Sequence, residues 1–320
     1  MPFRYIMQNT LHIGKDGNLP AIGYGTYQMT NEEVETYLFD AFRMGYRHVD
    51  TAESYNNELG VGRAIQRAMS ELGLKREEIF VTTKLWPGNM HWGQPEKDFE
   101  STITSFQTSL SNLGLEYIDL YLLHTAFPTK ARLEQWRALT ELRNRGIVKF
   151  IGVSNFSQQH IEEISSTKLP LPDANQIELH PWSQKTSLLE FMDSNRIVPI
   201  AYSSLLPLPS WRAAAPPDVM GNPSNAGKSP EMFDSNDVDV QFFGQLAEKY
   251  NVTTAQILLK WAIQRGFAIL PRSTNNVRME ENFNLDHFDL NEDEMAKMND
   301  MDRGKGMAWG PAVMDPIDAN

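Results

Sequence analysis

Short apolar runs alternate with longer amphipathic stretches along this 320-residue chain. Apolar runs bounded by turn residues are typical of buried strands, whereas apolar positions that recur at i, i+3 and i+4 are typical of helices. Eight runs predict strands, at 22–24, 47–50, 79–85, 118–124, 149–154, 174–179, 197–203 and 267–271. Nine stretches predict helices, at 31–44, 57–73, 95–114, 132–146, 157–168, 185–195, 238–266, 275–284 and 291–302.

The order of these segments predicts the fold. Strand and helix alternate eight times, and parallel strands joined by right-handed crossovers form either a doubly wound sheet or a closed barrel. Eight units favour the barrel, so we expect an α/β fold of the (β/α)8 TIM-barrel type, with residues 1–320 as a single domain. Residues 11–20 predict an N-terminal β-hairpin that plugs the bottom of the barrel, and 291–302 predicts an extra C-terminal helix.

Residues 203–236 break this rhythm, with six prolines, two glycines and little periodicity. A loop of this length inside a compact domain is usually functional or disordered. It follows the seventh predicted strand, on the face where a barrel keeps its active site, so we expect a lid there. A tolerated surface insertion is the alternative. The C-terminal tail, 304–320, has no predictable structure, and we expect it near the active-site mouth.

Composition narrows the possible classes of function. Hydrophobic residues make up 41% of the chain and charged residues 22%, as in ordinary globular enzymes. No apolar run approaches the ~18 residues of a membrane span, and no signal peptide is apparent, so a cytoplasmic protein is expected. The absence of cysteine excludes disulfides and thiol catalysis. A net charge of −12 argues against nucleic acid or an anionic membrane as partner, and seven scattered histidines predict no metal site.

Two partial nucleotide-binding motifs do not meet the requirements of their classes. The stretch 23–28, GYGTYQ, has two glycines of a dinucleotide fingerprint but lacks the third. The stretch 221–229, GNPSNAGKS, resembles a phosphate-binding P-loop, but its glycines are one residue too far apart and it follows no strand. The sequence therefore predicts neither a Rossmann fold nor an ATPase.

Four ionisable residues lie at or just after the ends of three consecutive predicted strands. Asp50 ends the second strand and Tyr55 follows it, Lys84 is near the end of the third, and His124 ends the fourth. Because the C-terminal strand ends of a barrel meet at one mouth, we expect these side chains to converge, with Tyr55 and Lys84 in contact. An ammonium lowers the pKa of a nearby phenol, Asp50 would keep Lys84 charged, and His124 can orient a substrate oxygen. Each residue alone has a structural alternative, but together they predict proton delivery to a carbonyl oxygen.

Three stretches carry a resemblance to a known family. They are GYRHVDTA at 45–52 with Glu58 and Gly62, KFIGVSNF at 149–156, and LPRS at 270–273 with Arg278 and Asn282. On these motifs, which span most of the chain in order, the sequence resembles the aldo-keto reductases, (β/α)8 barrels that use NADP. The resemblance implies that Asp50, Tyr55, Lys84 and His124 form the catalytic tetrad, with Tyr55 as general acid.

The same resemblance implies a set of cofactor contacts. Contacts to the nicotinamide are expected from Ser154, Asn155, Gln176 and the stacking residue Tyr202. Contacts to the adenosine 2′-phosphate and adenine are expected from Arg272, Ser273, Arg278, Glu281 and Asn282. A phosphate dianion favours guanidinium and hydroxyl donors, which agrees with these residue types. Further contacts are expected from Gly25, Thr26, Asp50, Ser203 and Leu205, with 203–236 as a belt over the pyrophosphate.

Aromatic residues near the predicted mouth are candidates for the walls of a substrate pocket. They are Tyr27, Trp86, Phe127 and Trp309, with His124 contacting the substrate oxygen. The chain departs from the family pattern at Thr125, where tryptophan often follows the catalytic histidine, and at Arg272, where lysine often precedes the phosphate-binding serine. A third departure is Tyr27, at a position where the family often has tryptophan.

These observations predict an NADPH-dependent reductase of aldehydes or ketones, reversible in principle, acting on a small carbonyl substrate as a monomer or weak oligomer. One alternative is preference for NAD or for both cofactors, if Glu231 or Asp234 reaches the ribose. A second is a catalytically weak NADPH-binding regulatory subunit, against which the intact tetrad argues. A barrel lyase or isomerase would leave the cationic pair Arg272 and Arg278 unexplained.

Overall fold

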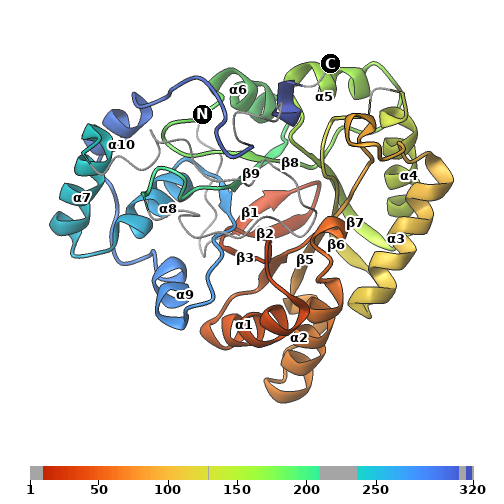
Figure 1. The fold of residues 1–320 in the computed structure, drawn as a ribbon, viewed down its shortest axis with the longest axis horizontal. Helices are drawn as coiled ribbons and strands as arrows, with labels where there is room; N and C mark the ends of the chain where they lie inside the picture. The colour runs from red at the N-terminus through yellow and green to blue at the C-terminus, as the bar shows by residue number, and fades with distance from the viewer. Residues whose placement is uncertain (1–9, 129, 210–235, 310–314, 319–320) are drawn as a thin grey trace.

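Eight parallel strands form one sheet that curves into a nearly closed barrel, with helices around it (Figure 1). The structure, a computed structural model, describes residues 10–128, 130–209, 236–309 and 315–318. The strands follow chain order around the sheet: β3 (Gly23–Gly25), β4 (His48–Asp50), β5 (Phe80–Leu85), β6 (Ile118–Leu123), β7 (Val148–Ser154), β8 (Ala174–Glu178), β9 (Val198–Tyr202) and β10 (Ala268–Ile269). A parallel bridge between Ile22 and Ile269 joins the two edges. The predicted (β/α)8 barrel is confirmed, with strand ends close to those expected.

An antiparallel hairpin packs against the N-terminal end of the barrel, as predicted. Its strands, β1 (Thr10–Ile13) and β2 (Gly17–Pro20), cross the middle of the ring in Figure 1. The ring of Phe150, near the beginning of β7, lies so close to the turn that a Cβ at Gly17 would be 2.1 Å from its Cζ. His48, at the beginning of β4, donates from Nδ1 to the Pro20 carbonyl oxygen at 3.1 Å. The hairpin therefore covers the bottom and leaves the C-terminal strand ends for chemistry.

The helices pack on the outside of the strands. They are α1 (Asn31–Met44), α2 (Glu58–Glu71), α3 (Phe99–Leu113), α4 (Arg132–Asn144), α5 (Gln158–Ser165), α6 (Thr186–Ser194), α7 (Val238–Tyr250), α8 (Thr254–Gln264), α9 (Asn276–Phe283) and the extra C-terminal helix α10 (Glu292–Asn299). Short 3-10 turns are η1 (Glu53–Tyr55), η2 (Arg76–Glu78), η3 (Met90–Trp92) and η6 (Pro316–Asp318). Local signals set several ends: Thr30 and Glu33 form a capping box at α1, and Gly114 ends α3 with a left-handed φ of 61°.

The prediction of one helix over 238–266 is wrong. The segment forms two helices, α7 and α8, separated at Asn251, which adopts a left-handed φ of 54°. Asparagine tolerates this conformation better than most residues, and the following Thr253 caps α8 by accepting a hydrogen bond from the Gln256 N–H. Periodicity continues across the break because both helices bury apolar side chains, so only the cap residues distinguish one helix from two.

The apolar core occupies the barrel interior and the layer between strands and helices. Buried polar side chains also lie at the C-terminal strand ends, where Lys84 is fully buried. Within the described residues, no helix has the length and apolar character needed to cross a membrane. In the same part of the chain, no three or more His, Asp or Glu side chains are grouped to hold a metal ion.

Candidate active site

The C-terminal ends of β4, β5 and β6 bring the four predicted catalytic residues together. Asp50 is the last residue of β4, Lys84 is the second-last of β5, and His124 directly follows β6. Tyr55 ends η1, the short turn after β4. Strand register pairs Leu85 with Leu123, so β5 and β6 end level, and it pairs Asp50 with Thr82, so β4 ends three residues earlier. Parallel strand ends thus gather residues that are far apart in the sequence.

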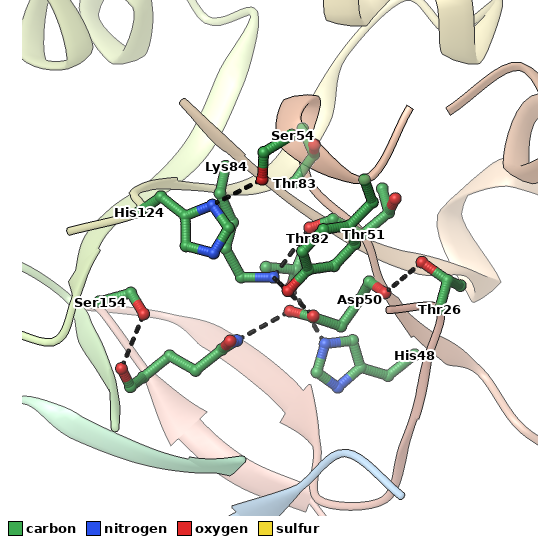
Figure 2. A network of polar contacts seen from close by, with 12 residues as sticks. Thr26, His48, Asp50, Thr51, Ser54, Thr82, Thr83, Lys84, His124 and Ser154 are labelled. Carbon is green, nitrogen blue, oxygen red and sulfur yellow. Dashed lines mark hydrogen bonds and ion pairs between the residues drawn. The ribbon is translucent and has the colours of Figure 1, made fainter. Parts of the chain in front are cut away.

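Lys84 is the centre of this group. Its Nζ donates to Asp50 Oδ1 at 2.6 Å, to the Thr51 carbonyl oxygen at 2.9 Å and to Tyr55 Oη at 3.4 Å. Figure 2 shows the lysine pointing between β4 and the turn that follows it. Burial lowers the pKa of Lys84, and the Asp50 carboxylate opposes that shift by stabilising the charged amine. The site therefore holds an ammonium group shared between a carboxylate and a phenol.

Both carboxylate oxygens of Asp50 have partners. Oδ1 accepts from Lys84, and Oδ2 accepts from Gln176 Nε2 at 2.8 Å. The backbone of Asp50 is held as well, because its carbonyl oxygen accepts from the N–H and the hydroxyl of Thr26, each at 3.0 Å. Asp50 thus links the lysine to a side chain in the middle of β8, on the opposite side of the barrel.

The turn that carries Tyr55 is anchored by Glu53. The Glu53 carboxylate accepts from the backbone N–H of Trp86 at 2.9 Å and forms an ion pair with Lys97 Nζ at 2.6 Å. The Tyr55 ring lies 4.9 Å from the ring of Tyr27 and 5.6 Å from that of His124, measured between centroids. The phenol is consequently fixed from two sides, with its oxygen directed at Lys84.

His124 is held by its backbone and by one ring nitrogen. Its N–H donates to the Leu85 carbonyl oxygen at 3.0 Å, and its own carbonyl oxygen accepts from Asn155 Nδ2 at 3.0 Å. Nδ1 lies 3.2 Å from the hydroxyl oxygen of Ser54 (Figure 2). Burial, and to a lesser extent the Lys84 cation, lower the pKa of His124 well below its usual range. The imidazole is therefore neutral at pH 7.

The predicted nicotinamide contacts lie beside this group, at the ends of β7, β8 and β9. Ser154 Oγ donates to the Gln176 carbonyl oxygen at 2.8 Å, and Asn155 Nδ2 donates to Ser154 Oγ at 3.1 Å. Tyr202 Oη donates to Asn155 Oδ1 at 2.7 Å. Side-chain amides both donate and accept hydrogen bonds, which matches the chemistry of a carboxamide. The donor set present here thus fits the nicotinamide end of the expected cofactor.

The predicted phosphate and adenine contacts form a second cluster, after β10. Arg272 and Arg278 are exposed, and Arg272 Nη2 donates to the Gln28 carbonyl oxygen at 2.9 Å. Ser273 is half-buried and lies before the N-terminus of α9. Guanidinium groups, a hydroxyl and a helix N-terminus together suit a phosphate dianion. Of the two residues expected near adenine, Glu281 is half-buried and Asn282 is buried, both on α9.

Two more of the expected cofactor residues lie directly after β9, and another lies at the end of β3. Ser203 has a left-handed φ of 54°, and its carbonyl oxygen accepts from the Leu206 N–H at 2.9 Å, which forms a turn around Leu205. Gly25 donates to the Pro271 carbonyl oxygen at 3.2 Å and so joins the ends of β3 and β10. Most of the expected belt, with Glu231 and Asp234, lies outside the described residues.

The aromatic residues expected at the substrate pocket line up beside His124. Centroid separations are 5.5 Å for Trp86 and His124, and 6.1 Å for Phe127 and Trp309. Trp92 fills the space between them, at 5.8 Å from Trp86 with parallel rings and at 5.7 Å from Phe127. We did not expect Trp92 from the sequence. Its place in the loop after a barrel strand, six residues beyond Trp86, is the signal that could have identified it.

The described part of the C-terminal tail is tied to the end of β8. Glu178 accepts from the N–H groups of Met307 and Ala308, at 2.7 and 2.9 Å, and pairs with His180 Nε2 at 2.8 Å. Burial would raise the pKa of Glu178, but these hydrogen bonds hold it below its usual range. Trp309 then reaches Tyr202, donating from Nε1 to Oη at 2.8 Å. Residues 310–314 and 319–320 of the tail lie outside the described residues.

Comparison with known proteins identifies the family of this chain. The model of the Aldo/keto reductase family matches residues 21–303. The chain is 36% identical to the 9,11-endoperoxide prostaglandin H2 reductase of Trypanosoma cruzi, over 94% of each chain. It is 34% identical to the methylglyoxal reductase DkgA of Escherichia coli, over 93% of this chain and 95% of the relative.

A solved structure shares the architecture as well. The Bombyx mori aldo-keto reductase in complex with NADP superposes with a TM-score of 0.79 at 30% identity, over 93% of this chain and 94% of that one. The family match, residues 21–303, spans all eight strands of the barrel. The chain is an oxidoreductase and belongs to the aldo/keto reductase family.

Proposed function

We propose that the protein reduces aldehydes or ketones to alcohols with NADPH and that Tyr55 is the general acid. The observation that carries this proposal is the position of Lys84, whose buried Nζ is 2.6 Å from Asp50 Oδ1 and 3.4 Å from Tyr55 Oη. A free phenol has a pKa of about 10 and is a poor proton donor at neutral pH. A buried ammonium beside it stabilises the phenolate, so the proton leaves more readily.

The proton and the hydride arrive at different atoms of the carbonyl group. A reduced nicotinamide held by Asn155 and Gln176 would supply the hydride to the carbonyl carbon. Tyr55 gives its phenolic proton to the carbonyl oxygen, and the negative charge left on the phenol is stabilised by Lys84. Asp50 keeps Lys84 protonated against the effect of burial. In the reverse direction the same phenolate accepts the proton of the alcohol.

His124 and the amide residues position the reactants. The neutral imidazole donates a hydrogen bond to the carbonyl oxygen without competing with Tyr55 as the acid. Asn155 and Gln176 would hold the carboxamide of the nicotinamide, because the Asn155 amide lies beside His124 and the Gln176 amide beside Asp50. Preorganised donors of this kind reduce the reorganisation that the reaction requires.

The choice of NADPH over NADH rests on the cluster after β10. Arg272 and Arg278 are exposed on either side of the α9 N-terminus, with Ser273 between them in sequence. Two guanidinium groups favour the additional phosphate of NADPH, which NADH lacks. The Bombyx mori relative in complex with NADP supports the same assignment.

We infer that the substrates are small aldehydes and ketones with one apolar side. A continuous row of aromatic rings begins beside His124 and consists of Trp86, Trp92, Phe127 and Trp309, and aromatic walls favour compact apolar groups. A relative named for methylglyoxal reduction makes methylglyoxal a suitable first probe.

The test measures NADPH consumption with methylglyoxal and with an aromatic aldehyde. Tyr55→Phe should reduce kcat by roughly 10³-fold and leave NADPH binding unchanged, because only proton donation is lost. Tyr117→Phe, at the opposite end of the barrel beside Arg76, is the matched control and should behave as wild type. Turnover of Tyr55→Phe equal to that of wild type would remove the acid assignment, and faster turnover with NADH would remove the cofactor assignment.

A further inference from the structure

Ser54 is the residue before Tyr55, and its side chain reaches His124 instead of solvent. Its hydroxyl oxygen lies 3.2 Å from His124 Nδ1, although the two residues are 70 positions apart in the sequence. Figure 2 shows the Ser54 hydroxyl directed at a nitrogen of the imidazole. One short turn, η1, therefore contributes to the site both the phenol and a hydroxyl group that contacts the histidine.

The protonation state of His124 makes this contact important. Burial and the Lys84 cation hold its pKa well below the usual range, so the ring carries a single N–H at neutral pH. A neutral imidazole has one donor nitrogen and one acceptor nitrogen, and the hydrogen bond made by one nitrogen decides the role of the other. Which nitrogen bears the hydrogen therefore decides whether His124 can donate to a substrate.

No competing partner holds either nitrogen among the described residues, where Ser54 is the sole hydrogen-bond partner of the ring. The rings of Trp86 and Tyr55 approach at centroid distances of 5.5 and 5.6 Å, both nearly edge-on. They restrict the rotation of the imidazole but do not select a tautomer. The Ser54 hydroxyl, which can donate to Nδ1 or accept from it, is therefore the contact on which the tautomer depends.

We propose that Ser54 donates its hydroxyl hydrogen to Nδ1 of His124 and so keeps the hydrogen of the imidazole on Nε2. This inference rests on the proposed function, because an Nε2–H is what would donate to the carbonyl oxygen of the substrate. The opposite tautomer would present a lone pair to that oxygen and repel it. Ser54 is thus a positioning residue: it acts on the reaction through His124 and touches no reacting atom itself.

The first test reads the tautomer directly. Histidine-labelled protein is examined at pH 7.5 by long-range ¹H–¹⁵N correlation NMR, and His124→Gln identifies the signals of this ring among the seven histidines. We expect the Nε2–H tautomer in the wild type and in Ser54→Thr, which keeps the hydroxyl. In Ser54→Ala we expect a large fraction of the Nδ1–H form. An Nδ1–H tautomer in the wild type, or an unchanged spectrum in Ser54→Ala, would overturn the proposal.

The second test separates positioning from general damage. For an aldehyde, kcat/KM should fall roughly tenfold in Ser54→Ala, a loss typical of one hydrogen bond, and should recover in Ser54→Thr. The KM for NADPH should stay the same in both. Ser70→Ala is the matched control, since the Ser70 hydroxyl bonds only within α2, to the Arg67 carbonyl oxygen. An unchanged kcat/KM in Ser54→Ala would contradict the positioning role.

The two tests distinguish failure of this inference from failure of the proposed function. The NMR result concerns the resting protein and needs no turnover. If the wild type reduced no carbonyl compound and the spectra still showed the Nε2–H tautomer lost in Ser54→Ala, the hydrogen bond would be established and the reductase assignment would be wrong.

Discussion

The two ends of the same barrel strands treat buried charge in different ways. At the N-terminal end of β6, the Asp119 carboxylate accepts from Arg76 Nη2 at 2.7 Å, from Lys149 Nζ at 2.9 Å and from the Val81 N–H at 3.0 Å. At the C-terminal end of β5, Lys84 has a single carboxylate partner, Asp50, and its third contact is a phenol. At the N-terminal end, two cationic side chains and a backbone N–H surround a single carboxylate. At the C-terminal end, a single cation is shared between a carboxylate and a phenol that can lose a proton.

The network around Asp119 is suited to stabilising the fold, whereas the network around Lys84 is suited to proton transfer. A buried ion pair contributes little net stability unless its remaining hydrogen-bonding groups are also satisfied. Asp119 meets that condition through three donors and joins η2, β5 and β7 around β6. The Lys84 amine satisfies its hydrogen-bonding groups only by donating to Tyr55 as well. The stabilisation of Lys84 and the acidity of the phenol are therefore linked. We therefore expect stability to reside at the bottom of the barrel and reactivity at the top, as is usual for this fold.

The strongest test of this contrast removes the buried cation. Lys84→Met should lower kcat/KM by about 10³- to 10⁴-fold, because Tyr55 then has no cation to stabilise its phenolate. Steady-state kinetics with NADPH and methylglyoxal measure the effect. Lys149→Met removes a cation from the opposite end and should retain near-normal kcat/KM in folded protein. Equal loss in both variants would show that the two ends do not differ in function.

The complementary change removes the anion at the bottom. Asp119→Asn should lower the free energy of unfolding by about 3 kcal/mol, because Arg76 and Lys149 lose their common carboxylate. Urea denaturation followed by tryptophan fluorescence measures the loss. Turnover per folded molecule should be unchanged at low temperature. A variant as stable as wild type would mean that this network has no stabilising role.

A third test concerns Asp315, a buried carboxylate whose charge is only weakly compensated by its cationic partner. Asp315 lies against Gly306, where a Cβ would be 2.2 Å from Asp315 Oδ2 and 3.0 Å from Glu178 Oε2, and its cation Lys185 is 3.9 Å away. Burial, and to a lesser extent Glu178, raise the pKa of Asp315 to about 6 despite Lys185. The folded chain therefore holds this proton more tightly than the unfolded chain does. That stabilisation is complete below pH ~4 and is lost as the pH rises through about 6.

Asp315→Asn removes this titration. The stability of the variant relative to wild type should increase by about 1.4 kcal/mol between pH 5 and pH 8, since only the wild type acquires the buried charge. Thermal unfolding at the two pH values measures the global effect, and hydrogen exchange of the Met307 and Ala308 amides measures the local one. A pH-independent difference between the two proteins would contradict the raised pKa.

The smallest expected effect concerns the exposed cations after β10. Arg272→Ala should raise the KM for NADPH about fivefold and leave the KM for NADH unchanged, because an exposed guanidinium–phosphate contact contributes only about 1 kcal/mol. Arg43→Ala, an exposed arginine on α1 paired only with Asp40, is the control. An equal change for both cofactors would place Arg272 away from the 2′-phosphate.

Much of the architecture follows from local sequence signals. Strand and helix order, the hairpin and most helix ends follow from periodicity and from caps such as Thr30 and Gly114, because these depend on neighbours within a few residues. The convergence of Asp50, Lys84 and His124 was also predictable, since parallel strand ends in a barrel must meet. The division of 238–266 into α7 and α8 was missed, because amphipathic periodicity continued through Asn251.

Contacts between loops were decided by the tertiary structure alone. No sequence periodicity relates the segments that meet in these contacts. Examples are Ser54 and His124 at 3.2 Å, Trp92 among the other aromatic side chains, and the tail residue Met307 at Glu178. The sequence by itself determined the barrel, because strand and helix alternate regularly along the chain. It also determined the set of reactive groups, because those residues lie at or just after the predicted strand ends. Only the folded chain decided which nitrogen of His124 lies beside the Ser54 hydroxyl and which carboxylates lie near each other, because loop conformation depends on packing across the whole mouth.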